Sequence, residues 1–239
     1  MFIIGTMTFL FPSGAFAAGT GSVSLAIQTV FWMAFNSFFF GITYGLLQIV
    51  GEFEIVRRER RIGLDLAAYV GSKLAVLLPL LAVVNAAQVI VMEAAGRLPD
   101  LSMLDRGGVF VSLQLLSAAA VVIGLHASAA VENSSQATLA LPMLCFPQVL
   151  FAGAVVPVSE MGWFAEFMSL PLAVRWGFEP LGRLLELGPG AADEAGTAGF
   201  VDAFTGSPAT GWAVLGVLVA MGAMATVRTL HKRTAVPAA

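Results

Sequence analysis

Charge is distributed very unevenly along this chain. Asp, Glu, Lys and Arg are absent from the first 51 residues, and a dense charged block then runs from Glu52 to Lys73. The block separates two apolar runs, residues 22–50 and 74–92, and about 20 apolar residues are enough for a helix to cross a bilayer. Across the chain 58% of residues are hydrophobic and 11% are charged, whereas soluble domains carry about 25% charged residues. We therefore expect an all-α membrane protein in which the charged block is a turn between two spans.

Apolar runs of spanning length recur along the sequence, so we predict a single transmembrane domain over residues 1–239. Five complete spans are expected, at residues 22–50, 68–95, 109–130, 137–156 and 209–230. Residues 1–12 are too short to cross, and we interpret them as a partial first span whose start is absent from this sequence. The small residues at positions 15 and 17 would also suit the cleavage site of a signal peptide, but the positively charged region that precedes such a site is missing.

Basic residues indicate which ends of the spans face the cytoplasm. With alternating spans, the charged block, the polar turn at residues 132–136 and the C-terminus lie on one side. That side carries eight basic residues, Arg57, Arg58, Arg60, Arg61, Lys73, Arg228, Lys232 and Arg233. The other side carries four, Arg97, Arg106, Arg175 and Arg183. We therefore predict that the turn at residues 51–67 and the C-terminus are cytoplasmic, in a multi-pass protein of the bacterial inner membrane.

Residues 157–208 follow neither the pattern of a span nor that of a plain loop. In their first part, aromatic residues such as Trp163 and Trp176 interleave with charged ones such as Arg175. This pattern predicts short re-entrant or interfacial helices at the outer face of the membrane, where tryptophan is enriched. The stretch 189–208 is rich in Gly and Ala, and we expect it to be an exposed outer loop.

The motifs that this sequence lacks argue against several kinds of chemistry. Gly-Ser-Lys at residues 71–73 is not preceded by the glycine of a phosphate-binding loop, so the chain is not expected to hydrolyse ATP. His126 and His231 have no partners at metal-ligand spacing, and Cys145 is the only cysteine, so no internal disulfide is possible. No pair of nucleophile and base is visible. We expect no catalytic residue, metal or cofactor in this chain, and no nucleic-acid partner.

The charged block allows two interpretations. Its arginines alone would make an ordinary positively charged anchor on the cytoplasmic side. However, acidic residues alternate with them, and Glu54 and Arg58 have the spacing and order of a helical ion pair. Gly63 then permits a sharp turn. Such a turn could hold the surface of a partner and transmit a tilt to the two adjoining spans.

Several short motifs, taken in order, resemble the membrane domain of ABC-2 type transporters, specifically the subfamily G-like permeases. They are Arg58-Glu59-x-x-x-Gly63, Ala68-Tyr69-Val70-Gly71-Ser72-Lys73 leading to Leu78-Pro79, Phe151-Ala152-Gly153 with Val155-Val156, and Arg175-Trp176-Gly177-Phe178-Glu179-Pro180-Leu181. The last is similar to the family segment Arg-Tyr-Gly-Phe-x-x-Leu, with Trp in place of Tyr. The resemblance covers residues 22–230 and implies a six-helix domain, here with its first helix truncated, that works as a dimer. ATP and magnesium would bind to separate nucleotide-binding domains.

The resemblance also implies three groups of site residues. Contact with the nucleotide-binding domain would involve Glu52, Glu54, Arg57, Arg58, Glu59, Arg60, Arg61 and Gly63, with residues 132–136 as a second contact. The substrate cavity would be lined by Met33, Asn36, Ser37, Phe40, Phe146 and Val149, and the outer gate would be formed by Ala154 and Val155. The alternative for the cavity and gate positions is contact with lipid or packing between helices. The small Ala154 would make the gate looser than in the family.

A cavity lined by Phe, Met and Val without fixed charge predicts a hydrophobic or amphipathic cargo, such as a lipid, a lipid-linked glycan or a drug-like molecule. The resemblance favours export by alternating access in a homodimer. A second hypothesis is a membrane scaffold or regulatory subunit that binds a cytoplasmic partner and moves nothing. A neighbouring or fused ATPase in the genome would distinguish the two.

Overall fold

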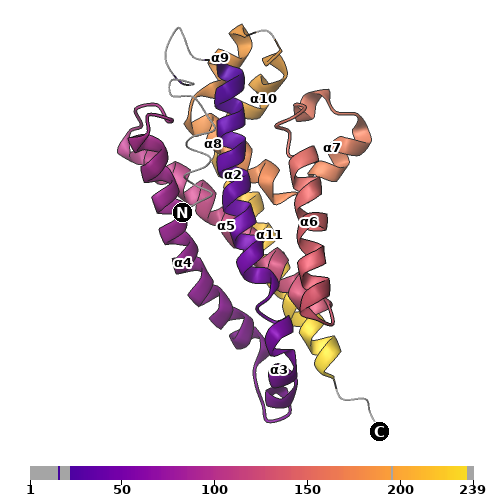
Figure 1. Ribbon diagram of the computed structural model, residues 1–239. Helices are drawn as coiled ribbons and strands as arrows, with labels where there is room; N and C mark the ends of the chain where they lie inside the picture. The colour runs from indigo at the N-terminus through magenta and orange to yellow at the C-terminus, as the bar shows by residue number, and fades with distance from the viewer. Residues whose placement is uncertain (1–15, 17–21, 195, 236–239) are drawn as a thin grey trace.

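The computed structural model describes residue 16 and residues 22–194 and 196–235, and this part of the chain is helical without a strand. Five long helices form the body of the molecule (Figure 1), namely α2 Val23–Leu46, α4 Leu66–Ala94, α5 Met103–Ala130, α6 Ser134–Phe151 and α11 Ala209–Thr234. The predicted partial span at residues 1–12 lies outside the described residues. The charged block forms η1 Val50–Glu52 and α3 Phe53–Arg60, followed by the first turns of α4.

Capping residues explain where the long helices begin. The side chains of Ser22, Asp65, Ser102 and Asn133 each accept a hydrogen bond from a backbone N–H in the first turn of α2, α4, α5 and α6, respectively. Such caps satisfy donors that have no partner within the helix. Because Ser102 caps α5, that helix begins at Met103, ahead of the span predicted at residues 109–130. Helix α6 ends at Phe151, ahead of Gly153, whose φ of 87° is a left-handed conformation.

Four helical stretches are long and apolar enough to cross a membrane: Val23–Arg60, Leu66–Ala94, Met103–Ala130 and Ala209–Thr234. The predicted span at residues 137–156 is not among them. Its helix, α6, has 18 residues and contains Pro142 and Pro147. Figure 1 shows α6 running from the lower end of the bundle up to α7. The chain is therefore an integral membrane protein, and a fifth crossing by α6 stays a prediction.

Helices α2 and α5 form the core of the bundle. In the apolar 18-residue stretch of each helix, 67% is buried for α2 and 72% for α5. The buried share is only 28% for α4 and 17% for α11. Small residues allow the two helices to pack closely. A Cβ atom added at Gly45 would lie 2.6 Å from the carbonyl oxygen of Val121, and one added at Gly124 would lie 2.7 Å from the carbonyl oxygen of Ile42. The spacing Gly41-x-x-x-Gly45 is therefore used for packing within the chain.

Short helices cover the upper end of the molecule in Figure 1. They are η2 Val158–Glu160, α7 Trp163–Ser169, α8 Ala173–Leu184, α9 Leu187–Asp193, η3 Ala198–Phe200 and α10 Val201–Phe204. The expectation of an exposed loop at residues 189–208 is wrong for the aromatic part of this stretch. Phe200 and Phe204 are buried and stacked with ring centroids 5.8 Å apart, and Phe204 packs against Phe178 of α8. The aromatic side chains of α7, including Trp163, are exposed instead.

Candidate functional site

The charged turn rests on a hydrophobic cluster of its own. Val56 is the buried residue of α3, and it belongs to a cluster with Leu66 and Val70 of α4, Ala129 of α5 and Leu230 of α11. The opposite side of α3 is polar, and Glu54, Arg57 and Arg58 are exposed. An amphipathic helix of two turns is thus fixed by its apolar side and presents charges of both signs to the solvent.

The start of the turn is bound to two of the long helices. Glu52 forms an ion pair with Lys73 of α4, with an Oε2–Nζ distance of 2.7 Å, and accepts a hydrogen bond of 3.2 Å from the hydroxyl of Tyr69. The backbone N–H groups of Ile49 and Val50 both donate to the hydroxyl of Ser128 on α5, at 3.0 and 2.9 Å. The segment that links α2 to α3 is therefore held to both α4 and α5.

The end of the turn is shaped by local backbone chemistry. Gly63 has a φ of 106°, a conformation that glycine adopts without the steric cost of a Cβ atom. The guanidinium of Arg60 donates to the carbonyl oxygen of Leu64 at 2.8 Å, across this reversal. Asp65 then caps α4 through the N–H of Ala67. Gly63 therefore makes the reversal that the sequence predicted at this position.

The eight residues predicted to contact a nucleotide-binding domain lie in η1, α3 and the turn after α3, but they differ in exposure. Glu54, Arg57, Arg58, Arg61 and Gly63 are exposed, whereas Glu52, Glu59 and Arg60 are half-buried. Within the described residues, Glu54 and Arg58 form no ion pair, so that part of the prediction is wrong. The ion pair of this region is the one between Glu52 and Lys73, which the spacing along a single helix could not indicate.

The second predicted contact, residues 132–136, is a short exposed corner between α5 and α6. Asn133 accepts a hydrogen bond from the N–H of Gln136 at 2.9 Å, and the side chain of Gln136 accepts one from the N–H of Glu132 at 3.0 Å. The arrangement resembles a capping box, except that the side chain of Gln136 accepts from the residue before the N-cap Asn133. Figure 1 places this corner, α3 and the C-terminal end of α11 together at the lower end of the bundle.

The predicted cavity residues of α2 lie inside the chain. Met33, Asn36 and Ser37 are 3%, 4% and 0% exposed, and Phe40 is half-buried against the cluster beneath α3. Asn36 donates to Gln88 of α4 at 2.8 Å, and Ser37 donates to Asn85 of α4 at 2.9 Å. This face of α2 therefore packs against α4 in the described structure, and a role in binding cargo stays a prediction for these four residues.

A network of amide and hydroxyl groups, which the sequence alone did not predict, joins α2, α4 and α5. Asn85 donates to Gln114 and to Ser117 of α5, at 3.0 and 3.1 Å, while Gln88 donates to the carbonyl oxygen of Met33 at 3.0 Å. Ser117 in turn donates to the carbonyl oxygen of Ser37. The available signal was a set of single amides within apolar spans, because polar side chains there bond across helices.

The predicted cavity residues of α6 line a groove that faces α2. Phe146 and Val149 border a hollow of about 330 Å³. The α2 side of this groove is formed by Phe35 and Phe39, one position away from the residues that we predicted. Val149 also borders a second hollow of about 360 Å³, together with the predicted gate residues Ala154 and Val155. Val149 therefore borders both hollows, and each of the other three predicted residues on the α6 side borders one of them.

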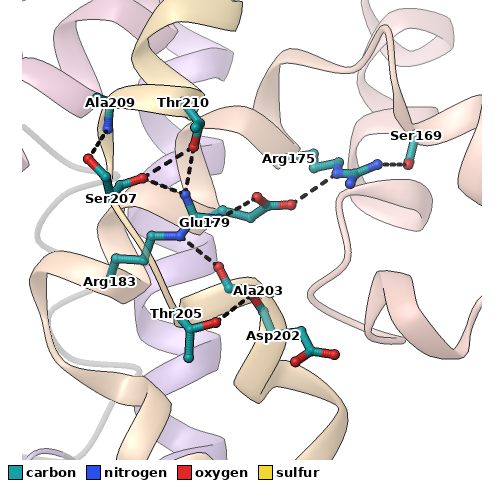
Figure 2. Close-up of polar contacts among 10 residues, drawn as sticks. All are labelled: Ser169, Arg175, Glu179, Arg183, Asp202, Ala203, Thr205, Ser207, Ala209 and Thr210. Atoms are coloured by element: carbon teal, nitrogen blue, oxygen red, sulfur yellow. Dashed lines mark hydrogen bonds and ion pairs between the residues drawn. The ribbon is translucent and has the colours of Figure 1, made fainter.

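A group of charged residues organises the upper end of the molecule (Figure 2). Glu179 of α8 is 7% exposed, and its two carboxylate oxygens pair with Arg175 and Arg183, each at 3.0 Å. Arg183 also donates to the carbonyl oxygens of Ala203 and Ser207, at 2.9 and 2.8 Å. Because one turn of helix separates the members of each pair, α8 carries both ion pairs along one face. The triad links α8 to α10 and to the segment that leads into α11.

Comparison with known proteins gives two results. The sequence pattern of the family described as ABC-2 type transporter matches residues 1–182. A relative from Mycobacterium tuberculosis (strain ATCC 25618 / H37Rv), the ABC transporter ATP-binding/permease protein Rv1747, is 29% identical over 160 residues. The aligned region covers 62% of this chain and 18% of that protein, so the similarity concerns a small part of the relative's length.

Proposed function

Because this chain belongs to the ABC-2 type transporter family, we propose that it is the permease half of an ATP-driven exporter for a hydrophobic or amphipathic cargo. Family membership implies a membrane transport component that works with an ATP-binding partner domain. The proposed partner binds at the cytoplasmic end formed by α3 and the corner at residues 132–136. A second copy of the chain would complete the transport path, and the two halves would alternate between inward and outward openings.

The construction of the charged turn carries this proposal. A passive anchor needs only positive charge near the membrane. Here an amphipathic helix with exposed charges of both signs packs on α4, α5 and α11 through Val56, and the segment that joins it to α2 is held by the ion pair between Glu52 and Lys73 and by Ser128. A force on α3 would therefore reach α2, α4 and α5 together. This is the mechanical property that ATP-driven movement requires.

The groove between α2 and α6 supports the proposed class of cargo. Its lining consists of apolar and aromatic residues with Cys145, which is buried. A charged cargo group placed there would lose its hydration without gaining a partner. The groove therefore suits hydrocarbon or aromatic groups, and the polar part of an amphipathic cargo would stay at the membrane surface.

The proposal is tested by reconstituting the full-length transporter with its ATPase in vesicles and measuring cargo moved per ATP hydrolysed. Arg58→Ala and Glu59→Ala should lower this ratio while the protein stays folded. Glu166→Ala is the matched control, since Glu166 is an exposed carboxylate on α7 at the opposite end. An unchanged ratio in both α3 variants would contradict the role of the turn. Binding of the ATPase without any movement of cargo would instead favour the scaffold hypothesis.

A further inference from the structure

The last turn of α11 contacts both segments that form the proposed surface for the ATPase. Arg233 donates to the carbonyl oxygens of Ala129 and Val131 at the end of α5, at 2.7 and 2.6 Å. The same guanidinium lies over the ring of Phe53, the first residue of α3, with 4.4 Å between its carbon and the ring centroid. One side chain therefore joins α3, the corner between α5 and α6, and α11.

Each of these contacts suits an arginine. The last carbonyl groups of a helix have no partner within it and carry a partial negative charge, and Arg233 supplies donors to two of them. The planar guanidinium can at the same time stack on an aromatic face. A lysine has no such plane, and its single charged group cannot reproduce both types of contact with the same geometry.

Neighbouring residues keep the end of α11 in place for these contacts. Leu230 is fully buried in the cluster beneath α3, and Thr234 is 6% exposed. Arg60 of α3 lies 2.9 Å from Nε2 of His231. Because a guanidinium has no acceptor, this nitrogen of His231 must be the acceptor. Arg233 thus works within a docked helix end and is not a free side chain on a flexible tail.

We propose that Arg233 is a positioning residue for energy coupling: it holds α3 and the corner at residues 132–136 in one fixed arrangement. This inference rests on the proposed function, because the two segments are the proposed contacts for the ATPase. The consequence is that the two contacts move as one body, and that their movement reaches α11 directly. The bonds of Ser128 hold only the segment before α3, so they do not replace this link.

The first test measures the arrangement itself and needs no ATP. Spin labels are placed at Ile55→Cys on α3 and Glu132→Cys at the corner, both exposed, in the full-length protein carrying Cys145→Ser. Pulsed electron paramagnetic resonance measures the distance between the two labels of a chain. The distribution of this distance should be narrow for the parent and broad for Arg233→Gln. Lys232→Gln, the matched loss of charge at an exposed neighbouring position, should leave it narrow. Equal distributions for the two variants would overturn the inference.

Further variants keep the test decisive if Arg233→Gln does not fold. Arg233→Lys keeps the charge, and Phe53→Leu removes only the ring beneath the guanidinium. Each should broaden the distance distribution partly, and a parent-like distribution in both would also overturn the inference.

The second test separates this inference from the proposed function. In vesicles, Arg233→Gln should lower the cargo moved per ATP severalfold while ATP hydrolysis continues, and Lys232→Gln should not. If the unmodified transporter moves no cargo but the label distances still broaden in Arg233→Gln, the proposed function fails and the positioning role stands. If the unmodified transporter moves cargo and Arg233→Gln moves the same amount of cargo per ATP, the positioning role is refuted and the proposed function stands.

Discussion

The packing of α2 against α5 leads to a sharp prediction, because two glycines of α2 have no room for a side chain. A Cβ atom at Gly41 would lie 2.5 Å from the carbonyl oxygen of Ser117 and 2.7 Å from the Cβ atom of Ala120. One at Gly45 would lie 2.6 Å from the carbonyl oxygen of Val121. Carbon atoms pack favourably at about 3.5 to 4.0 Å, so alanine would require the two helices to separate by roughly 1 Å.

We expect Gly41→Ala and Gly45→Ala each to destabilise the protein by about 1 to 3 kcal/mol, the usual cost of overpacking a core. For chains of this length, 1 kcal/mol lowers the unfolding temperature by about 2 to 4 °C. The expected decrease is therefore about 2 to 12 °C, the product of these ranges. The measurement is the fraction of detergent-solubilised protein that remains monodisperse after heating.

Gly216→Ala is the matched control. Gly216 lies within α11, and a Cβ atom there would meet nothing within 4 Å. Since alanine favours helix over glycine by about 1 kcal/mol, this variant should be as stable as the parent or more stable. The reasoning would be refuted if Gly41→Ala and Gly45→Ala matched Gly216→Ala, because α2 and α5 could not then approach as closely as described.

Two further predictions concern buried polar groups. Asn85→Leu removes the hydrogen bonds of α4 to three partner residues on α2 and α5, and at about 0.6 kcal/mol for each partner between membrane helices it should destabilise by ~2 kcal/mol. Val83→Leu, at a position 69% exposed, should have no effect in the same heating assay. Glu179→Ala leaves Arg175 and Arg183 without their carboxylate partner, so we expect a loss of about 3 to 5 kcal/mol. Replacing the exposed Glu166 by Ala should cost less than 1 kcal/mol, and equal losses would show that the triad contributes nothing.

The sequence located the candidate site more reliably than it described the site's internal contacts. The charged block, Gly63 and the exposed arginines of α3 were predicted, because charge and glycine act locally. The partners that hold the turn were not, since Ser128 lies about 80 positions after Ile49 and Arg233 about 180 positions after Phe53. Contacts between residues so far apart depend on how the helices are arranged.

Apolar runs and charge by themselves determined that this chain is helical and lies in a membrane, and which segments meet at each end of the bundle. The rotation of α2 was decided only by tertiary structure. That helix carries apolar residues on every face, so periodicity does not distinguish one face from another. Gly41 and Gly45 face α5, and Asn36 and Ser37 find amide partners on α4, which leaves Phe35 and Phe39 toward α6. The physical reason is that close approach and hydrogen bonding between helices, which need a partner surface, set the orientation of a helix with apolar residues on every face.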